Sequence, residues 1–194
     1  MGRMFDALQK LEREKTGRDT QKSPGTEIPE HAVLDDKLVS FFAPSSLVTE
    51  QFRRLRTHII KPNSPSAYKT IMVTSAMPSE GKSLISINLA VIIALELHSH
   101  ALLVDCDLRN PSISRFFGLH QEKGLSNYLL GEAEVPDLLV KTAVDKLSVL
   151  PGGPVQENPV ELIGSEKMKG LIKELKLRYA DRYIVLDTSP ILAT

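Results

Sequence analysis

The chain has 194 residues, and its 24 basic residues balance its 24 acidic residues, so its formal net charge is zero. A balanced charge gives no net field that would attract nucleic acid or an anionic membrane, and a single cysteine, Cys106, excludes an internal disulfide. The length favours one α/β domain with an attached arm, and without a signal-peptide pattern we expect a cytoplasmic protein.

The first 44 residues differ in composition from the rest of the chain. Residues 4–13 place Met4, Ala7, Leu8 and Leu11 on one helical face, which predicts a short amphipathic helix in residues 1–13. Residues 14–36 are polar, carry Pro24, Gly25 and Pro29 and show no sustained periodicity. We therefore expect a flexible N-terminal arm, with a linker over 14–44 and one domain over 45–194.

A helix is predicted from a cap at Ser45 or Ser46 to about Ile60. Its apolar residues should face the core or a neighbour: Leu47, Phe52, Leu55 and Ile59. A charged row occupies another face: Glu50, Arg53 and Arg56. From spacing alone, this row indicates a ladder of intrahelical salt bridges.

The next segment has the order strand, tight loop and helix. An apolar strand at about 70–75 precedes the loop SAMPSEGKS at 75–83, and a long apolar stretch follows at 84–97. Backbone N–H groups at such a loop and helix N-terminus bind phosphates, the lysine reaches the β- and γ-phosphates, and the serine hydroxyl binds Mg²⁺. Ala76 replaces the usual first glycine, and a chance Gly-Lys-Ser is the alternative. The expected phosphate-binding residues are Ser79, Glu80, Gly81, Lys82, Ser83 and Leu84.

Strands and helices continue to alternate to the end of the chain. Apolar runs predict strands at 101–105, 147–150 and 183–187; the expected helices lie at 112–117, 124–130, 135–141 and 165–179. This order predicts a doubly wound, mostly parallel sheet flanked by helices, whose ligand site lies beyond the carboxyl ends of the strands. Asp105 and Asp187 fall at such ends. The stretch 84–97 is too short to cross a bilayer, so we expect no membrane span.

Three of these segments resemble the bacterial tyrosine kinases of capsule and exopolysaccharide synthesis, a branch of the P-loop NTPases. The matching segments are SAMPSEGKS at 75–83, LLVDCDLRNP at 102–111 and IVLDTSP at 184–190, similar to the family's Walker A, A′ and B motifs. EQFRRLR at 50–56 resembles the family's subunit-interface helix, which favours an interface over a simple salt-bridge ladder. The opening MFDAL at 4–8 is similar to soluble autokinases of exopolysaccharide loci, including the exosortase-associated group.

The resemblance implies an ATP- and Mg²⁺-dependent tyrosine autokinase. Lys82 would then hold phosphates, Asp105 would orient or deprotonate the attacking tyrosine, and Asp107 would join the catalytic set. The implied Mg²⁺ ligands are Ser83, Asp107 and Asp187. The family also implies a ring-like homo-oligomer through Glu50, Arg53 and Arg56, and a membrane-embedded polysaccharide co-polymerase or chain-length adaptor that brings the protein to the membrane.

The sequence departs from this family in two ways. Its four tyrosines form no C-terminal cluster, and the chain stops just after the third motif, so we expect a C-terminally truncated form whose own activity is open. One alternative is a septum-site or partition-type ATPase, although the signature lysine of that class is replaced by Met77. The other is a non-catalytic, nucleotide-responsive regulator of polysaccharide chain length.

Overall fold

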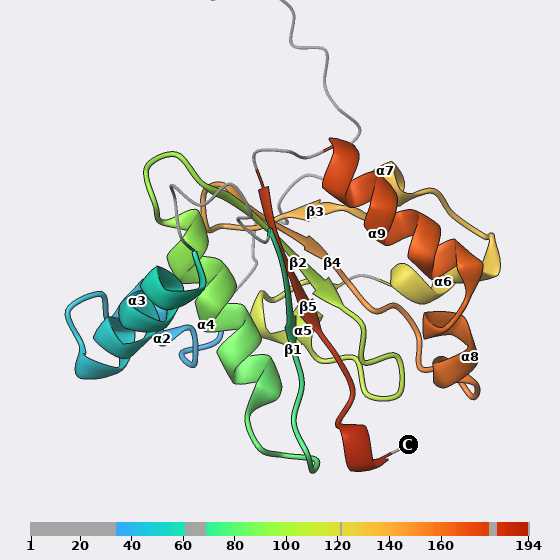
Figure 1. Cartoon of the computed structure of the whole chain (residues 1–194), viewed down its shortest axis with the longest axis horizontal. Helices are drawn as coiled ribbons and strands as arrows, with labels where there is room; N and C mark the ends of the chain where they lie inside the picture. Colours follow the sequence, from blue (N-terminus) through green and yellow to red (C-terminus); the bar gives the residue numbers. More distant parts are fainter. Residues whose placement is uncertain (1–33, 61–68, 121, 179–181, 194) are drawn as a thin grey trace, which may run out of the picture.

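A computed structural model describes residues 34–60, 69–120, 122–178 and 182–193. The helix expected near the N-terminus and most of the expected linker lie outside these residues. The described residues form a five-stranded sheet in the order β1-β5-β2-β4-β3 (Figure 1). The strands are β1 (Thr70–Val73), β2 (His100–Asp105), β3 (Val140–Lys141), β4 (Leu147–Leu150) and β5 (Arg182–Asp187). All neighbouring pairs are parallel except β3 and β4, which are antiparallel.

Both faces of the sheet are covered by helices, as Figure 1 shows. Along β2, Ala101 and Leu103 belong to the hydrophobic core on one face, while Leu102 and Val104 belong to the core on the other. All four side chains are fully buried, because successive residues of a strand point to opposite faces. The predicted doubly wound α/β architecture is confirmed.

The long helix α4 (Lys82–Ala94) is buried on every side from Ser86 to Ala94. It lies between the sheet and two further helices, α2 (Val39–Phe42) and α3 (Leu47–Ile59). A helix that is apolar all round needs such cover on both sides. In the part of the chain that the structure describes, no helix combines the length and hydrophobicity needed to cross a membrane.

The remaining helices lie at the ends of the strands and on the face of the sheet opposite to α4. They are α5 (Ile113–Phe116), α6 (Leu125–Leu130), α7 (Val135–Leu138), α8 (Pro159–Ile163), α9 (Glu166–Arg178) and the 3₁₀ helix η1 (Ile191–Ala193). The helix expected over 135–141 is wrong in its second half, because the backbone becomes extended at Leu139 and Val140 pairs with Val149. Helix α8 was not expected from periodicity; it is a short turn that begins at Pro159, which suits a first helical position.

The expected linker also ends earlier than position 44. Leu38 is fully buried in the core on the α4 side. The buried Asn88 of α4 donates its amide to the Lys37 carbonyl at 2.9 Å, and its oxygen accepts the Ser40 N–H at 2.9 Å. The structure therefore differs from the expected boundary at 45, because a polar side chain far along the sequence satisfies the backbone of residues 37–40.

Helix α3 begins as predicted at Ser46, whose hydroxyl accepts the Thr49 N–H at 3.1 Å. Its apolar residues divide into two groups. Phe52 and Ile59 pack on the core, whereas Leu47 is 85% exposed and Leu55 is 38% exposed. The second pair faces away from this domain's core.

Candidate functional site

The loop between β1 and α4 is held in shape by its own polar groups. The Glu80 carboxylate accepts the N–H groups of Ala76 at 2.9 Å and Met77 at 3.0 Å. Gly81, with φ of 86°, precedes α4 in the left-handed conformation that glycine adopts without strain. The Glu80 side chain therefore shapes the start of the loop, while residues 79–84 lie at the N-terminus of α4.

Two carboxylates, one just after the end of β2 and one at the end of β5, bind the first two residues of α4. The Lys82 ammonium lies 2.7 Å from the Asp107 carboxylate, and both side chains are nearly buried. The Ser83 hydroxyl donates to Asp187 at 2.7 Å. Lys82 and Asp107 are 25 positions apart in the sequence, and Ser83 and Asp187 are 104 positions apart. The three motifs therefore meet at one point, at the ends of β1, β2 and β5.

Three serines that the sequence reasoning did not select complete these contacts. Ser86 donates to Asp187 at 2.9 Å, and Ser189 donates to Asp107 at 3.0 Å. The Ser112 hydroxyl lies 3.4 Å from that of Ser83. Ser86 follows Ser83 by three positions on a helix, a spacing that places both on one face and could have identified it.

Asp105 occupies a different position from the other two carboxylates. Its side chain is fully buried and accepts three backbone N–H groups, from Asp107 at 3.2 Å, Ser112 at 2.8 Å and Ile113 at 3.0 Å. Burial raises the pKa of Asp105 to about 7, although these hydrogen bonds oppose the shift. Burial also raises the pKa of Asp187, against the effect of its Ser83 hydrogen bond and of Lys82. Asp105 therefore faces the protein's own backbone in this structure.

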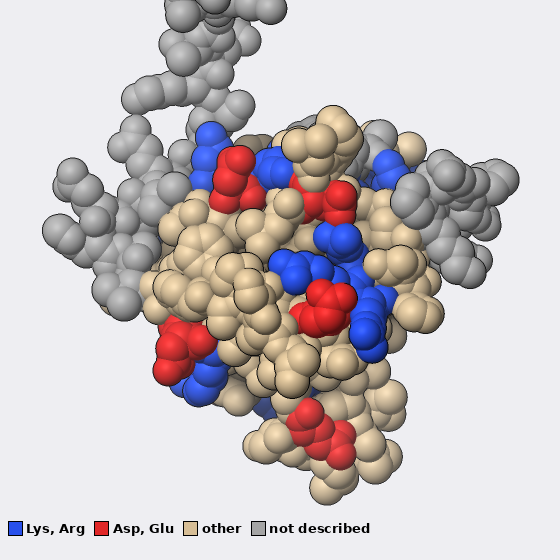
Figure 2. Space-filling view, turned by 90° about the vertical axis from the view of Figure 1, so that its left-hand side faces the viewer, with Lys and Arg blue, Asp and Glu red and all other residues tan. Residues whose placement is uncertain are grey.

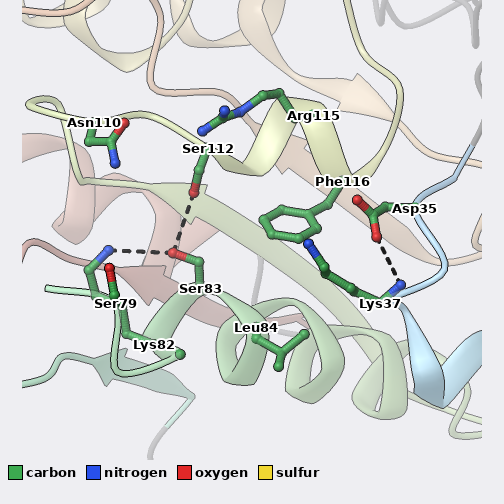
Figure 3. A pocket seen from close by; sticks show the side chains of 11 residues that line it. Asp35, Lys37, Ser79, Lys82, Ser83, Leu84, Asn110, Ser112, Arg115 and Phe116 are labelled. Carbon is green, nitrogen blue, oxygen red and sulfur yellow. Dashed lines mark hydrogen bonds between the residues drawn. The ribbon is translucent and has the colours of Figure 1, made fainter.

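A cavity of about 560 Å³ adjoins the loop (Figure 3). One wall is formed by residues of the loop and the start of α4, including Lys82 and Ser83. The opposite wall is formed by α5 and by the segment at 35–37. The volume is typical of ligand pockets, which commonly measure about 300–1,000 Å³.

The charged row of α3 lies on another face of the domain. Figure 2 shows that this side carries basic and acidic side chains close together. Arg53 lies 3.2 Å from Glu50 within the helix. Arg56 instead contacts Glu96 at 2.6 Å and donates to the Ile92 carbonyl at 3.2 Å, near the end of α4. The row is thus partly a ladder within α3 and partly a link between α3 and α4.

The chain is similar to known tyrosine kinases, although no protein-family model matches it. It is 37% identical over 160 residues to tyrosine-protein kinase YwqD of Bacillus subtilis, an alignment that covers 82% of this chain. The chain spans 66% of the length of YwqD. The crystal structure of the chimerical protein CapA2B2 matches with a TM-score of 0.75 and 34% identity, covering 86% of this chain and 73% of the other.

A second group of solved structures is similar over a shorter region. The septum site-determining protein MinD from Pyrococcus horikoshii, complexed with Mg-ADP, matches with a TM-score of 0.52 and 29% identity. This match covers 61% of this chain and 47% of that protein. The likeness to CapA2B2 is therefore both closer and more extensive.

Proposed function

The chain belongs to the bacterial tyrosine kinase family of capsule and exopolysaccharide synthesis, and on this premise we propose that it transfers the terminal phosphoryl group of ATP to tyrosine. The observation that carries the proposal is the pairing of Lys82 with Asp107 and of Ser83 with Asp187 at the start of α4. A phosphate-binding loop and two strand-end carboxylates are the parts that such a reaction needs. Nucleotide and Mg²⁺ binding is supported further by the likeness to MinD, which was solved with Mg-ADP.

The donor groups at this point fit a nucleotide-bound Mg²⁺. Ser83, Asp107 and Asp187 offer only oxygen ligands, which this ion prefers. The described residues contain no group of three or more His, Cys, Asp or Glu side chains that could hold a metal by themselves. That is compatible with Mg²⁺, which usually binds one or two carboxylates together with phosphate oxygens and water.

The reaction asks little covalent chemistry of the protein. The tyrosine oxygen bonds to the γ-phosphorus, the bond to the bridging oxygen breaks, ADP leaves, and the phenolic proton passes to a carboxylate of the site. Bound Mg²⁺ would neutralise charge on the β- and γ-phosphates. Lys82 and the N-terminal amides of α4 would orient the phosphates, because the helix dipole and the ammonium both favour anions there.

For Asp105 we propose a positioning role. Its carboxylate already accepts three N–H groups and is fully buried, so in this geometry it has no direct path to a tyrosine hydroxyl. The expectation that Asp105 deprotonates the tyrosine is therefore less favoured than a role in fixing Asp107 and α5. Asp107, bound directly to Lys82, is the better candidate for contact with the reacting groups.

We also propose a homo-oligomer and a membrane partner for the kinase. We propose that Glu50, Arg53 and Arg56 contribute to a ring-like homo-oligomer, with the exposed Leu47 and Leu55 of the same helix beside them. A membrane-embedded polysaccharide co-polymerase or chain-length adaptor would activate the protein and hold it at the cytoplasmic side of the membrane. The family resemblance supports both partners.

The test is a paired assay for phosphotyrosine and ATP hydrolysis, with and without the cytoplasmic tail of the membrane partner. Wild type is compared with Lys82→Met and with Lys176→Met, a control at an exposed position of α9. The proposal requires phosphotyrosine that disappears in Lys82→Met and persists in the control. Hydrolysis without phosphotyrosine would indicate a switch ATPase, and the absence of both activities would indicate a non-catalytic regulator.

A further inference from the structure

The wall of the cavity opposite the phosphate-binding loop has no assigned role. It is formed by Arg115 and Phe116 of α5 and by Asp35 and Lys37, which precede α2. These two segments are about 80 positions apart in the sequence, and neither belongs to the three nucleotide-binding motifs. We call this surface the α5 wall.

The α5 wall offers an apolar surface next to the loop. Phe116 of α5 and Leu84 of α4 both line the cavity, from different sides of it (Figure 3). Leu84, in the first turn of α4, is 38% exposed. An aromatic side chain of a ligand could pack between them, because rings associate favourably with other rings and with aliphatic groups.

The same wall carries positive charge that the protein itself leaves available. Among the described residues, the Arg115 guanidinium makes no hydrogen bond or ion pair, and the Lys37 ammonium lies 5.9 Å from the Phe116 ring centroid without an ion pair. Lys82 is already paired with Asp107. The Asp35 carboxylate also lines the cavity, where it accepts the Lys37 N–H at 2.9 Å. Two available cations therefore outnumber one carboxylate.

Both segments of the wall are fixed to the core. Asp105 accepts the Ser112 and Ile113 N–H groups at the start of α5, which sets the direction of this short helix. The Asp35 N–H donates to the Phe116 carbonyl at 2.9 Å, and Asn88 holds the Lys37 carbonyl. The backbone that carries the two cations is thus positioned before any ligand arrives, which lowers the entropic cost of binding.

The wall also lies at the correct end of the loop for a phosphoryl acceptor. The Ser112 hydroxyl, just before α5, is 3.4 Å from that of Ser83, the residue that would bind the nucleotide's Mg²⁺. We propose that the α5 wall is the acceptor subsite, in which Lys37 and Arg115 select a tyrosine flanked by carboxylates. This inference rests on the proposed kinase function and adds the charge of the acceptor and the residues that recognise it.

The experiment measures peptide binding rather than turnover. A fluorescein-labelled peptide with one tyrosine between glutamates is titrated with the protein at saturating ADP and Mg²⁺, and its anisotropy is recorded. A matched peptide carries glutamines in place of the glutamates. We expect Arg115→Glu to weaken binding of the acidic peptide at least tenfold and Lys37→Gln to weaken it severalfold, while Lys176→Glu on α9 leaves it unchanged.

A fluorescent ADP analogue is titrated against the same variants. Its affinity should stay within about twofold of wild type in Arg115→Glu. The inference is overturned if the acidic and glutamine peptides bind equally, or if Arg115→Glu leaves peptide binding intact. It is also overturned if nucleotide affinity falls in parallel, because the α5 wall would then hold the nucleotide. Since no phosphoryl transfer is measured, acidic-peptide binding in a protein that makes no phosphotyrosine would count against the kinase proposal alone.

Discussion

The two walls of the cavity differ in whether their charged side chains are paired within the protein. On the loop wall, Lys82 and Ser83 are each bound to a buried carboxylate, so every charge has a partner at a set distance. On the α5 wall, Arg115 and Lys37 are exposed and have no carboxylate partner among the described residues. The loop wall has the fixed geometry that the proposed phosphoryl transfer requires, whereas the α5 wall has the available charge that the proposed recognition of an acceptor requires.

The largest effect is expected from removing one carboxylate from the loop wall, because its charges are paired with each other. Asp107→Asn keeps the shape of the side chain but leaves the nearly buried Lys82 ammonium without its anionic partner. We expect phosphotyrosine formation to fall by about 10²–10³, the typical cost of losing one electrostatic group from an active site. Initial rates at saturating ATP would measure this. Asp137→Asn, at an exposed position of α7, should keep the wild-type rate; an unchanged rate in Asp107→Asn would exclude it from the catalytic set.

A second substitution tests whether the α5 wall depends on the core beneath it. Asn88→Ala leaves the Ser40 N–H and the Lys37 carbonyl without their partner, at a cost of about 1–3 kcal/mol in unfolding free energy. Because Lys37 loses its support, affinity for the acidic peptide should fall further than affinity for ADP. Urea denaturation and the two titrations measure these effects.

The control for Asn88 is Asn110→Ala, since Asn110 is an exposed asparagine at the edge of the cavity. Its effect on unfolding should remain within about 0.5 kcal/mol. Equal destabilisation by the two substitutions would show that Asn88 has no special role in anchoring residues 37–40.

The pH dependence of stability distinguishes Asp105 from the carboxylates that bind Lys82 and Ser83. Burial raises the pKa of Asp105 from its ordinary value of 3.8 to about 7 in the folded protein, so folding favours the protonated form. This stabilisation is complete below pH 3.8 and is lost as the pH rises through 7. Melting temperatures measured in EDTA should therefore fall as the pH rises from about 4.5 to about 7.5, roughly the interval between the two pKa values. The fall should be steeper in wild type than in Asp105→Asn.

The substituted amide does not titrate, so the Asp105→Asn protein lacks this contribution throughout the interval. A tenfold change in the proton affinity of one carboxyl on folding corresponds to about 1.4 kcal/mol of unfolding free energy, which is large enough to resolve by calorimetry. Parallel pH profiles for the two proteins would contradict this prediction, because they would show that folding does not raise the pKa of the Asp105 carboxyl.

The smallest effect is expected at α3, which lies outside the cavity and carries both paired and exposed groups. Arg56→Ala breaks the contact with Glu96 and should cost about 0.5–1 kcal/mol, whereas Arg53→Ala removes only an exposed intrahelical pair. Glu96→Gln serves as the control, because it weakens the same contact without changing α3. Both arginine variants should lower the oligomer mass in light scattering; if the mass is unchanged in the double variant, these residues do not form the interface.

Much of the proposed nucleotide site could be predicted from the sequence because its signals are local. The loop at 75–83 and the strand-end carboxylates occur within short contiguous segments, and parallel strands necessarily bring their carboxyl ends to one edge of the sheet. A cap at Ser45 or Ser46 was predicted for the same reason, since the Ser46 hydroxyl and its N–H partner are three positions apart.

Contacts between distant segments were decided by the tertiary structure alone. The packing of residues 34–43 depends on Asn88, the partner of Arg56 is Glu96, and the extended Val140 depends on its pairing with β4. The burial of Asp105 and the joining of residues 35–37 to α5 have the same origin. Periodicity and motif spacing describe neighbours along the chain, whereas these features depend on which surfaces meet after folding. The sequence by itself therefore determined the half of the cavity that we propose binds phosphate, and the tertiary structure determined the half that faces the proposed acceptor.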